Sequence, residues 1–262
     1  MRCFLIVTMV GAVLACMPMA LAQDAETKES SVVAAVAEQW GKLSSMRADV
    51  SANAGVPAGE NTLNVVATGD MAFLKKDDKA MARMELSVFM AESASDAEMA
   101  HVLLVSDGAK AAVQYKLFGR LQHMDLPAEQ VSAGGVDGQL LVGLLNQHFT
   151  LKDLPDGELD GKPVYMLEGA PTFDLPNDTP LNVVRAYFDK ETGVLLRLSA
   201  INTDGSVLLD VLLKNIELNP DISESLFVVP APPPPPEPKP APGAPPATES
   251  PKEEKAEAAS GE

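Results

Sequence analysis

The side chains that could do covalent chemistry in this 262-residue chain begin with its cysteines, Cys3 and Cys16. Both precede Ala20-Leu21-Ala22, which has the small-x-small pattern of a signal peptidase site. Cleavage after Ala22 would remove both thiols, so the mature chain is expected to have neither disulfides nor cysteine chemistry. Residues 13–16, Val-Leu-Ala-Cys, form an imperfect lipobox, and lipidation of Cys16 is the alternative.

The polar residues that could bind a metal show no ligand pattern. His101, His123 and His148 stand in different predicted elements, where solvent-facing or hydrogen-bonded histidines are the simpler interpretation. Acidic residues gather at Asp153, Asp156, Glu158, Asp160, Asp174 and Asp178. Calcium is an alternative role for them, but EF-hand spacing is missing and acidic turns explain them more simply.

Sequence motifs of catalysis are also missing from the chain. It contains no G-x-S-x-G, H-E-x-x-H, P-loop or G-x-G-x-x-G pattern. The sequence therefore predicts a protein that is not an enzyme and that uses neither a metal nor a cofactor.

The formal net charge of −17 limits the partners of the chain. A surface this acidic repels phosphate backbones, so nucleic acid is not expected to bind. It also repels anionic lipid headgroups, which argues against stable adsorption to membranes.

Composition divides the chain into three parts. Residues 1–22 have the positive start (Arg2) and short apolar run of a signal peptide, so export to the periplasm is expected, with a lipid anchor through Cys16 as the alternative. Residues 23–229 are long enough for one domain with a substantial core. Residues 230–262 are proline-rich and acidic, with no large apolar residue after Val229, and are predicted to be a disordered tail.

Hydrophobic periodicity predicts which elements build the domain. Val33, Val36, Trp40 and Leu43 share one face of a helix that Ser30 or Ser31 could cap. Strict apolar–polar alternation then predicts strands through residues 46–51, 63–73 and 80–90, with turns at Lys76-Asp77-Asp78 and Asp107-Gly108. Further strands are predicted at 164–168, 181–190, 194–202 and 207–215.

Between these strand regions the period changes to that of a helix. Leu141, Leu144 and Leu145, flanked by Leu140 and Phe149, have helical spacing, and Pro155-Asp156-Gly157 and Asp160-Gly161 are predicted turns. The total is about ten antiparallel strands with two or three helices. A curved sheet wrapped around so few helices is the economical way to bury its apolar face.

Three segments and a C-terminal stretch in two parts, in this order, resemble the LolA family of periplasmic lipoprotein carriers and together span nearly the whole domain. They are KLSSMRADVSANAG (42–55), GDMAFLKK (69–76), VLLVSDGAKAAVQY (102–115), and YFDKETGVLLRL (187–198) with NIELNPDISESLFVVPAP (215–232). The resemblance implies an unclosed β-barrel covered by helices, mainly antiparallel β, around a cavity that holds acyl chains. It implies transport of an acylated lipoprotein or lipid cargo by a monomer, with membrane-bound donor and acceptor proteins as partners. An envelope-stress sensing or regulatory module on the same fold is the alternative.

The apolar inventory and the alternation assign residues to such a cavity. Eight of the twelve methionines follow the predicted signal peptide, and against one tryptophan they make an adaptable interior, although ordinary core residues would give the same count. The predicted lining is Val50, Val65, Met71, Met84, Leu86, Val88, Leu104 and Val113 from strands, with Trp40, Leu141, Leu144 and Leu145 as the helical lid. The chain departs from the family at Val50, where an aromatic residue is usual. The family's Arg falls on Lys75 and its Pro on Lys76, and by the resemblance Lys75 takes the place of the lid and release residue. Lys offers a point charge instead of a planar fork.

Overall fold

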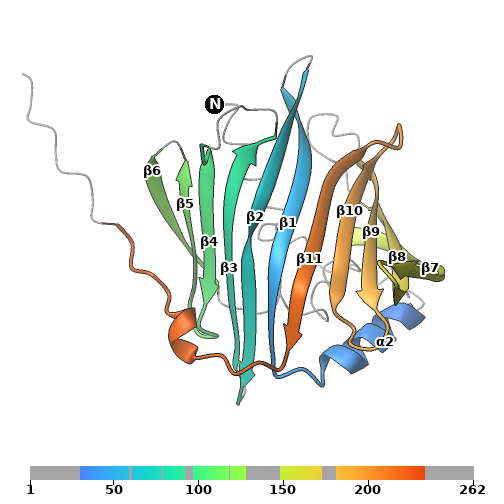
Figure 1. Ribbon diagram of the computed structural model, residues 1–262, viewed down its shortest axis with the longest axis horizontal. Coiled ribbons are helices and arrows are strands. Elements are labelled where there is room, and N and C mark those ends of the chain that lie inside the picture. Colours follow the sequence, from blue (N-terminus) through green and yellow to red (C-terminus); the bar gives the residue numbers. More distant parts are fainter. Residues whose placement is uncertain are drawn as a thin grey trace, which may run out of the picture.

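The computed structural model describes residues 30–58, 61–77, 79–91, 97–117, 119–127, 148–172 and 181–233. These residues form one curved antiparallel sheet of eleven strands, one α-helix and one short 3-10 helix (Figure 1). The helix α2 (Ser31–Trp40) comes first in the chain, and the 3-10 helix η2 (Glu224–Phe227) comes after the last strand.

The strands run as two successive meanders joined side by side. The first contains β1 (Ser45–Ala58), β2 (Asn61–Lys76), β3 (Lys79–Met90), β4 (Ala100–Ser106), β5 (Ala111–Leu117) and β6 (Arg120–Leu126). The second contains β7 (Phe149–Leu159), β8 (Lys162–Pro171), β9 (Leu181–Asp189), β10 (Leu195–Asn202) and β11 (Val207–Leu218). Because the strand order is β6-β5-β4-β3-β2-β1-β11-β10-β9-β8-β7, the first and last strands meet in the middle, and β6 and β7 are the two edges.

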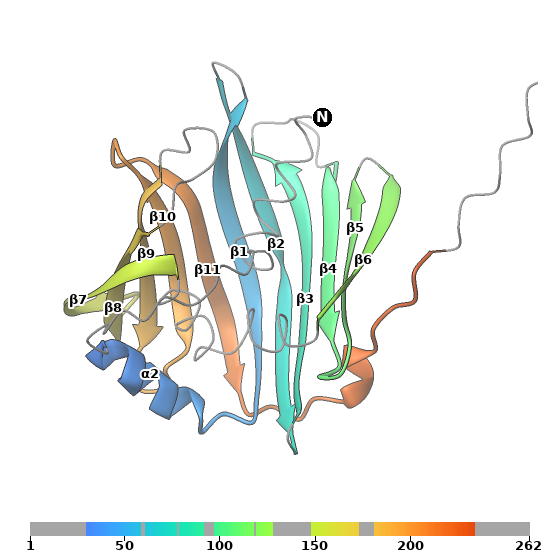
Figure 2. The ribbon, with the colours of Figure 1, turned by 180° about the vertical axis from the view of Figure 1, so that it is seen from behind.

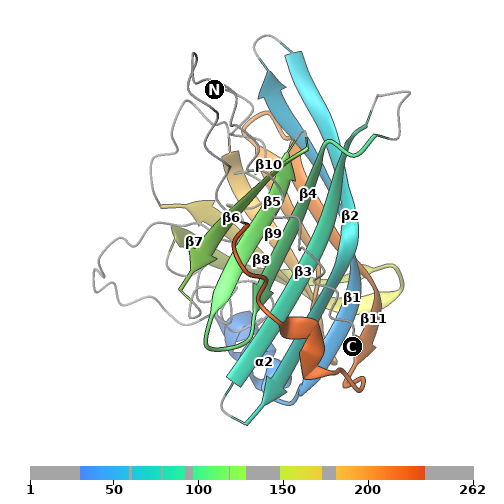
Figure 3. The same cartoon turned by 90° about the vertical axis from the view of Figure 1, so that its left-hand side faces the viewer.

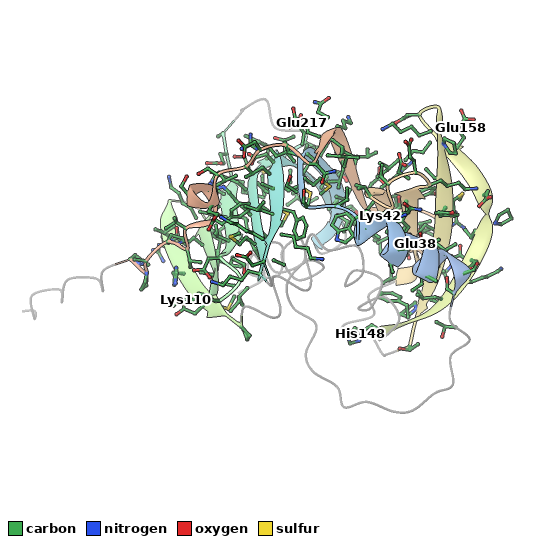
Figure 4. All side chains as sticks on the ribbon, turned by 90° about the horizontal axis from the view of Figure 1, so that it is seen from below. Glu38, Lys42, Lys110, His148, Glu158 and Glu217 are labelled. Carbon is green, nitrogen blue, oxygen red and sulfur yellow. The ribbon has the colours of Figure 1, made fainter. Side chains whose placement is uncertain are left out.

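The sheet has an apolar face and a polar face, as the alternation predicts. We call the face that carries α2 the inner face; seen from below, the sheet curves around the helix (Figure 4). One lateral row of paired residues crosses all eleven strands on this face. From β7 to β6 it reads Asp153, Leu167, Ala186, Leu198, Val211, Ala52, Ala67, Val88, Ala100, Leu117 and Arg120. The nine residues of the row on the inner strands are apolar, and the row ends in a charged residue on each edge strand.

The opposite, outer face carries the charged residues of the same strands. On β8 and β9, the Arg185 guanidinium donates to the Glu168 carboxylate, with 2.8 Å between Nε and Oε2. On β10 and β11, the Arg197 guanidinium donates two hydrogen bonds to the Asp210 carboxylate, with 2.7 Å between Nε and Oδ1 and 3.1 Å between Nη2 and Oδ2. The hydrogen bonds and charge of Asp210 raise the pKa of Arg197. These cross-strand pairs fix the register that turns the apolar side chains inward.

Helix α2 lies under the lower ends of β8, β9 and β10 (Figure 2). It buries Val32, Val33, Val36 and Trp40, and each such side chain contributes about 1.5–3 kcal/mol when removed from water. Of the two serines predicted as possible caps, Ser30 is the N-cap, and its hydroxyl accepts from the Val33 backbone N–H at 3.3 Å. The β9–β10 turn packs against the helix at Gly193, where φ is +69° and a Cβ would lie 2.9 Å from the Val36 carbonyl oxygen.

The segment after β11 returns across the outer face (Figure 3). Ile222 and Phe227 are buried there against Ala72 of β2 and Met81 of β3. Lys76 pairs with Glu224 of η2, and the Gln114 side chain of β5 donates to the Ala231 carbonyl oxygen at 3.2 Å. The described chain therefore stays attached to the sheet beyond its last strand.

The sequence-based fold is confirmed in its main outline and corrected in detail. The open, mainly antiparallel sheet is as predicted, with eleven strands instead of about ten. Pro155-Asp156-Gly157 is not a turn: it lies inside β7, where the register with β8 shifts between Leu154 and Gly157. Phe149 begins that strand, although the spacing suggested a helix flank. The described residues hold one α-helix, and the helix predicted around 141–145 lies outside them.

Candidate ligand-binding face

The first meander carries the best-patterned part of the inner face. Ala48, Met71, Met84, Leu104 and Val113 are cross-strand partners in sequence from β1 to β5, and all are buried. Met124 of β6 continues the row and is 44% exposed, so the row reaches the surface at the edge strand. Unbranched methionine side chains make this surface adaptable in shape.

A second row on the inner face lies two residues further along β1, at Val50 instead of Ala48. Val50, Gly69, Leu86 and Val102 are partners from β1 to β4, and Val50 also faces Leu213 of β11. Leu213 is only half-buried although it packs against the buried cluster. The apolar surface therefore continues past the junction between the two meanders.

Val211 stands where the buried clusters of the inner face converge. It packs against the Met71–Met84 cluster, the cluster under α2 and the Ala67–Val88 cluster, and it is nevertheless half-buried. Ile216 of the same strand is also half-buried against the first of these clusters. Alternation in the predicted strand 207–215 could have added Val211 and Leu213 to the predicted lining, which omitted them.

Trp40 closes one end of this face from the last position of α2. Its ring centroid lies 5.7 Å from that of Phe73, at an interplanar angle of 44°. Leu43, Met46 and Val194 belong to the same buried cluster. The indole Nε1 is buried and, within the described part of the chain, has no hydrogen-bond partner. An unsatisfied buried donor costs about 1–3 kcal/mol.

The predicted lining residues of the described strands lie on the inner face and are buried. They are Val50, Val65, Met71, Met84, Leu86, Val88, Leu104 and Val113, and the predicted lid residue Trp40 is buried with them. Leu141, Leu144 and Leu145 lie outside the described residues. Lys75 is exposed near the end of β2, two residues after Phe73. Its cross-strand partner is Ala80 of β3. Its backbone N–H donates to the Ser44 carbonyl oxygen at 2.7 Å.

Three of the acidic residues considered for calcium have structural roles. Asp153 binds the start of α2: it accepts from the Ser30 hydroxyl, the Ser31 hydroxyl at 2.7 Å and the Ser31 backbone N–H at 3.0 Å. Asp156 pairs with Lys190, and Asp160 has a φ of +49° in the β7–β8 turn. Asp174 and Asp178 lie outside the described residues. No group of three or more metal-binding side chains occurs among the residues that the structure describes.

The histidines do not converge. His101 lies on the outer face between Glu85 and Glu98, with 3.1 Å from each ring nitrogen to a carboxylate oxygen. His123 contacts Asp125 at 3.0 Å on β6, and His148 precedes β7 at the other end of the sheet (Figure 4). Their separation gives no common site for acid–base chemistry.

Neither a protein-family model nor a curated protein matches the chain. In the described ranges, no helix has the length and apolar character needed to cross a membrane.

The chain is similar to several solved structures at low identity. The Pseudomonas aeruginosa MucA/MucB complex is 14% identical, with 76% of this chain and 59% of that chain covered and a TM-score of 0.44. The chain thus spans about three fifths of that structure's length.

Two further solved structures are covered over nearly their whole length. An outer membrane lipoprotein-sorting protein domain from Vibrio parahaemolyticus is 10% identical, with 74% of this chain and 95% of that chain covered and a TM-score of 0.36. A LolA superfamily protein from Nitrosomonas europaea is 10% identical, with 76% and 96% covered and a TM-score of 0.30. The solved structures similar to this chain thus include members of the family that its sequence resembles.

Proposed function

We propose that the chain is a non-catalytic periplasmic carrier that binds acylated cargo, such as a lipoprotein, against the inner face of its sheet. The observation that carries this proposal is the row of apolar cross-strand partners that crosses the sheet. The row meets charged residues only where it ends, on the two edge strands. Among the described elements, one ten-residue helix packs on this face.

Desolvation supplies the binding energy in this proposal. Each buried methylene contributes about 0.8 kcal/mol, so an acyl chain is held without polar chemistry. The half-buried Val211, Leu213 and Ile216 are the residues against which such a chain gains most, because they still have apolar surface to cover. The methionines of the adjoining row adapt to chains of different shape.

Lys75 has a proposed part in release, which the resemblance to LolA implies. Its place at the exposed end of β2, one step beyond the buried Phe73, puts a charge at the rim of the apolar surface. There it can contact the polar part of a cargo whose acyl chain lies inside. Lys75→Ala is expected to change the rate of cargo transfer more than the affinity for a simple fatty acid.

The test is binding of a fluorescent fatty-acid probe to two variants of neighbouring β11 residues. Val211 and Leu212 are both half-buried but face opposite sides of the sheet. Val211→Glu is expected to abolish probe binding, because an unpaired carboxylate would stand where the alkyl chain lies. Leu212→Glu, whose carboxylate would lie beside Arg197 on the outer face, is expected to bind the probe like the parent.

Equal binding by the two variants, or no binding by the parent protein, would contradict the proposal. Mass spectrometry of material that co-purifies with the parent protein separates the carrier from a regulatory module on the same fold. A carrier is expected to retain lipid or acylated protein, and a regulatory module a protein partner without acyl chains.

A further inference from the structure

The indole N–H of Trp40 is the exception among the buried polar side-chain groups of the described chain. The three buried serines are all hydrogen-bonded. Ser45 donates to the Pro220 carbonyl oxygen at 2.6 Å, Ser106 accepts from the Gly108 N–H at 3.2 Å, and Ser199 donates to Asp210 at 2.6 Å. Trp40 Nε1 has no such partner, although the residue is only 5% exposed.

The side chains of the hydrophobic cluster that contains Trp40 provide no acceptor for its N–H. Its described cluster neighbours include Leu43, Met46, Phe73 and Val194, which offer no polar side-chain atoms. A buried water needs two to four polar partners, and these four side chains provide none. An acceptor carried by a ligand that is otherwise apolar would satisfy the indole and suit the neighbours.

We infer that Trp40 Nε1 donates a hydrogen bond to the carbonyl oxygen of an acyl group, the ester or amide carbonyl that joins the fatty chain to its cargo. This inference rests on the proposed carrier function and names the ligand chemistry that the site selects. Trp40 packs against Phe73, which is the cross-strand partner of Met46 on the inner face. A carbonyl held there places the following methylenes on the apolar rows of Met71 and Leu86. The site is therefore selective for acyl groups over ether-linked or plain alkyl chains.

Competition against the fatty-acid probe tests the assignment with three ligands of equal chain length. The ligands are palmitic acid methyl ester, an N-palmitoyl amide and hexadecyl methyl ether. The ester and amide are expected to compete about tenfold better than the ether, since only they present a carbonyl to the buried donor. In Trp40→Phe, which keeps an aromatic ring and removes the N–H, the three ligands are expected to compete equally, at the affinity of the ether.

Intrinsic fluorescence of the unmodified protein gives a second measurement, because Trp40 is the only tryptophan. Emission is expected to shift to longer wavelength with the ester and the amide but not with the ether. This measurement stands even where Trp40→Phe fails to fold. Equal competition by ester and ether in the parent, without an emission shift, overturns the role of Trp40 and leaves the carrier function intact. Failure of all three ligands to displace or replace the probe overturns both.

Discussion

At Gly69 in β2, the backbone of the neighbouring strand comes closer than a side chain permits. A Cβ built on Gly69 would lie 1.8 Å from the Glu85 carbonyl oxygen of β3. Gly69 belongs to the inner-face row between Val50 and Leu86, and a side chain at this position would collide with the backbone of β3. A glycine inside a strand commonly marks such a close approach.

Gly69→Ala is therefore expected to destabilise the protein by about 3 kcal/mol, the upper end of the range for overpacking, because backbone must move. Urea unfolding measures the change. Gly41→Ala is the control: Gly41 caps α2 with a φ of −57°, and its Cβ would lie 3.4 Å from the Ala37 carbonyl oxygen. That variant should be as stable as the parent or slightly more stable. A similar loss in both variants would show that the close approach at Gly69 is not the cause.

Helix α2 depends for its N-terminus on a strand that lies far from it in the sequence. Asp153 of β7 accepts hydrogen bonds from Ser30 and Ser31, in addition to the local cap from Ser30. Burial alone would raise the pKa of the Asp153 carboxyl, but the hydrogen bonds from these serines and from the helix backbone outweigh it and lower the pKa. The ionised carboxylate thus ties the helix to the edge strand.

This arrangement predicts a pH-dependent contribution to stability. A carboxyl whose pKa is lowered by folding stabilises the protein above its ordinary pKa of 3.8, and that contribution is lost as the pH falls through the folded value. Asp153→Asn is expected to lower the free energy of unfolding by about 1 kcal/mol at neutral pH. In acid, the free energy of unfolding of this variant is expected to depend less on pH than that of the parent. Asp156→Asn, which removes an exposed partner of Lys190 on the same strand, is the control. Parallel pH profiles of the parent and Asp153→Asn would refute this role.

Local patterns predicted the strands but not their long-range partners. Met84, Leu86 and Val88 were assigned to the apolar face by alternation, and the structure buries all three on the inner face. The β7 strand was missed because Pro155, Asp156 and Gly157 are turn residues in isolation, and pairing with β8 overrides that preference. The Asp153 contact with α2 and the unpaired nitrogen of Trp40 were also not predictable. Both depend on which distant residues are brought together, about which periodicity says nothing.

At the scale of the whole molecule, the segment after β11 packs on the outer face of the sheet. Phe227 is 1% exposed and packs on the outer face with Ile222 against Ala72 and Met81. The last described contact is the hydrogen bond from Gln114 to Ala231. The domain boundary expected at residue 229 is therefore better tested beyond Pro233.

Truncation after Pro233 is expected to leave the melting temperature unchanged, because the sequence beyond it has no large apolar residue. Phe227→Ala should cost about 3–5 kcal/mol by leaving a cavity against β2 and β3. Val228→Ala, at a neighbouring position that is 67% exposed, should be near neutral. Thermal unfolding monitored by circular dichroism distinguishes the three. A large drop on truncation would place a packed segment after Pro233.

The meeting of β1 with β11 in the middle of the sheet has a consequence for the order of folding. Every other strand pair joins strands adjacent in the chain, whereas the contact from Ser44 to Asn219 spans 175 residues. Hairpins can form as soon as their strands are present, but this central pair must await the last strand and close a long loop. Until then β1 is an unpaired edge beside an uncovered apolar surface, which is the kind of edge that recruits other chains. Aggregation during refolding should therefore depend on how quickly β11 arrives, more than on the stability of the finished sheet.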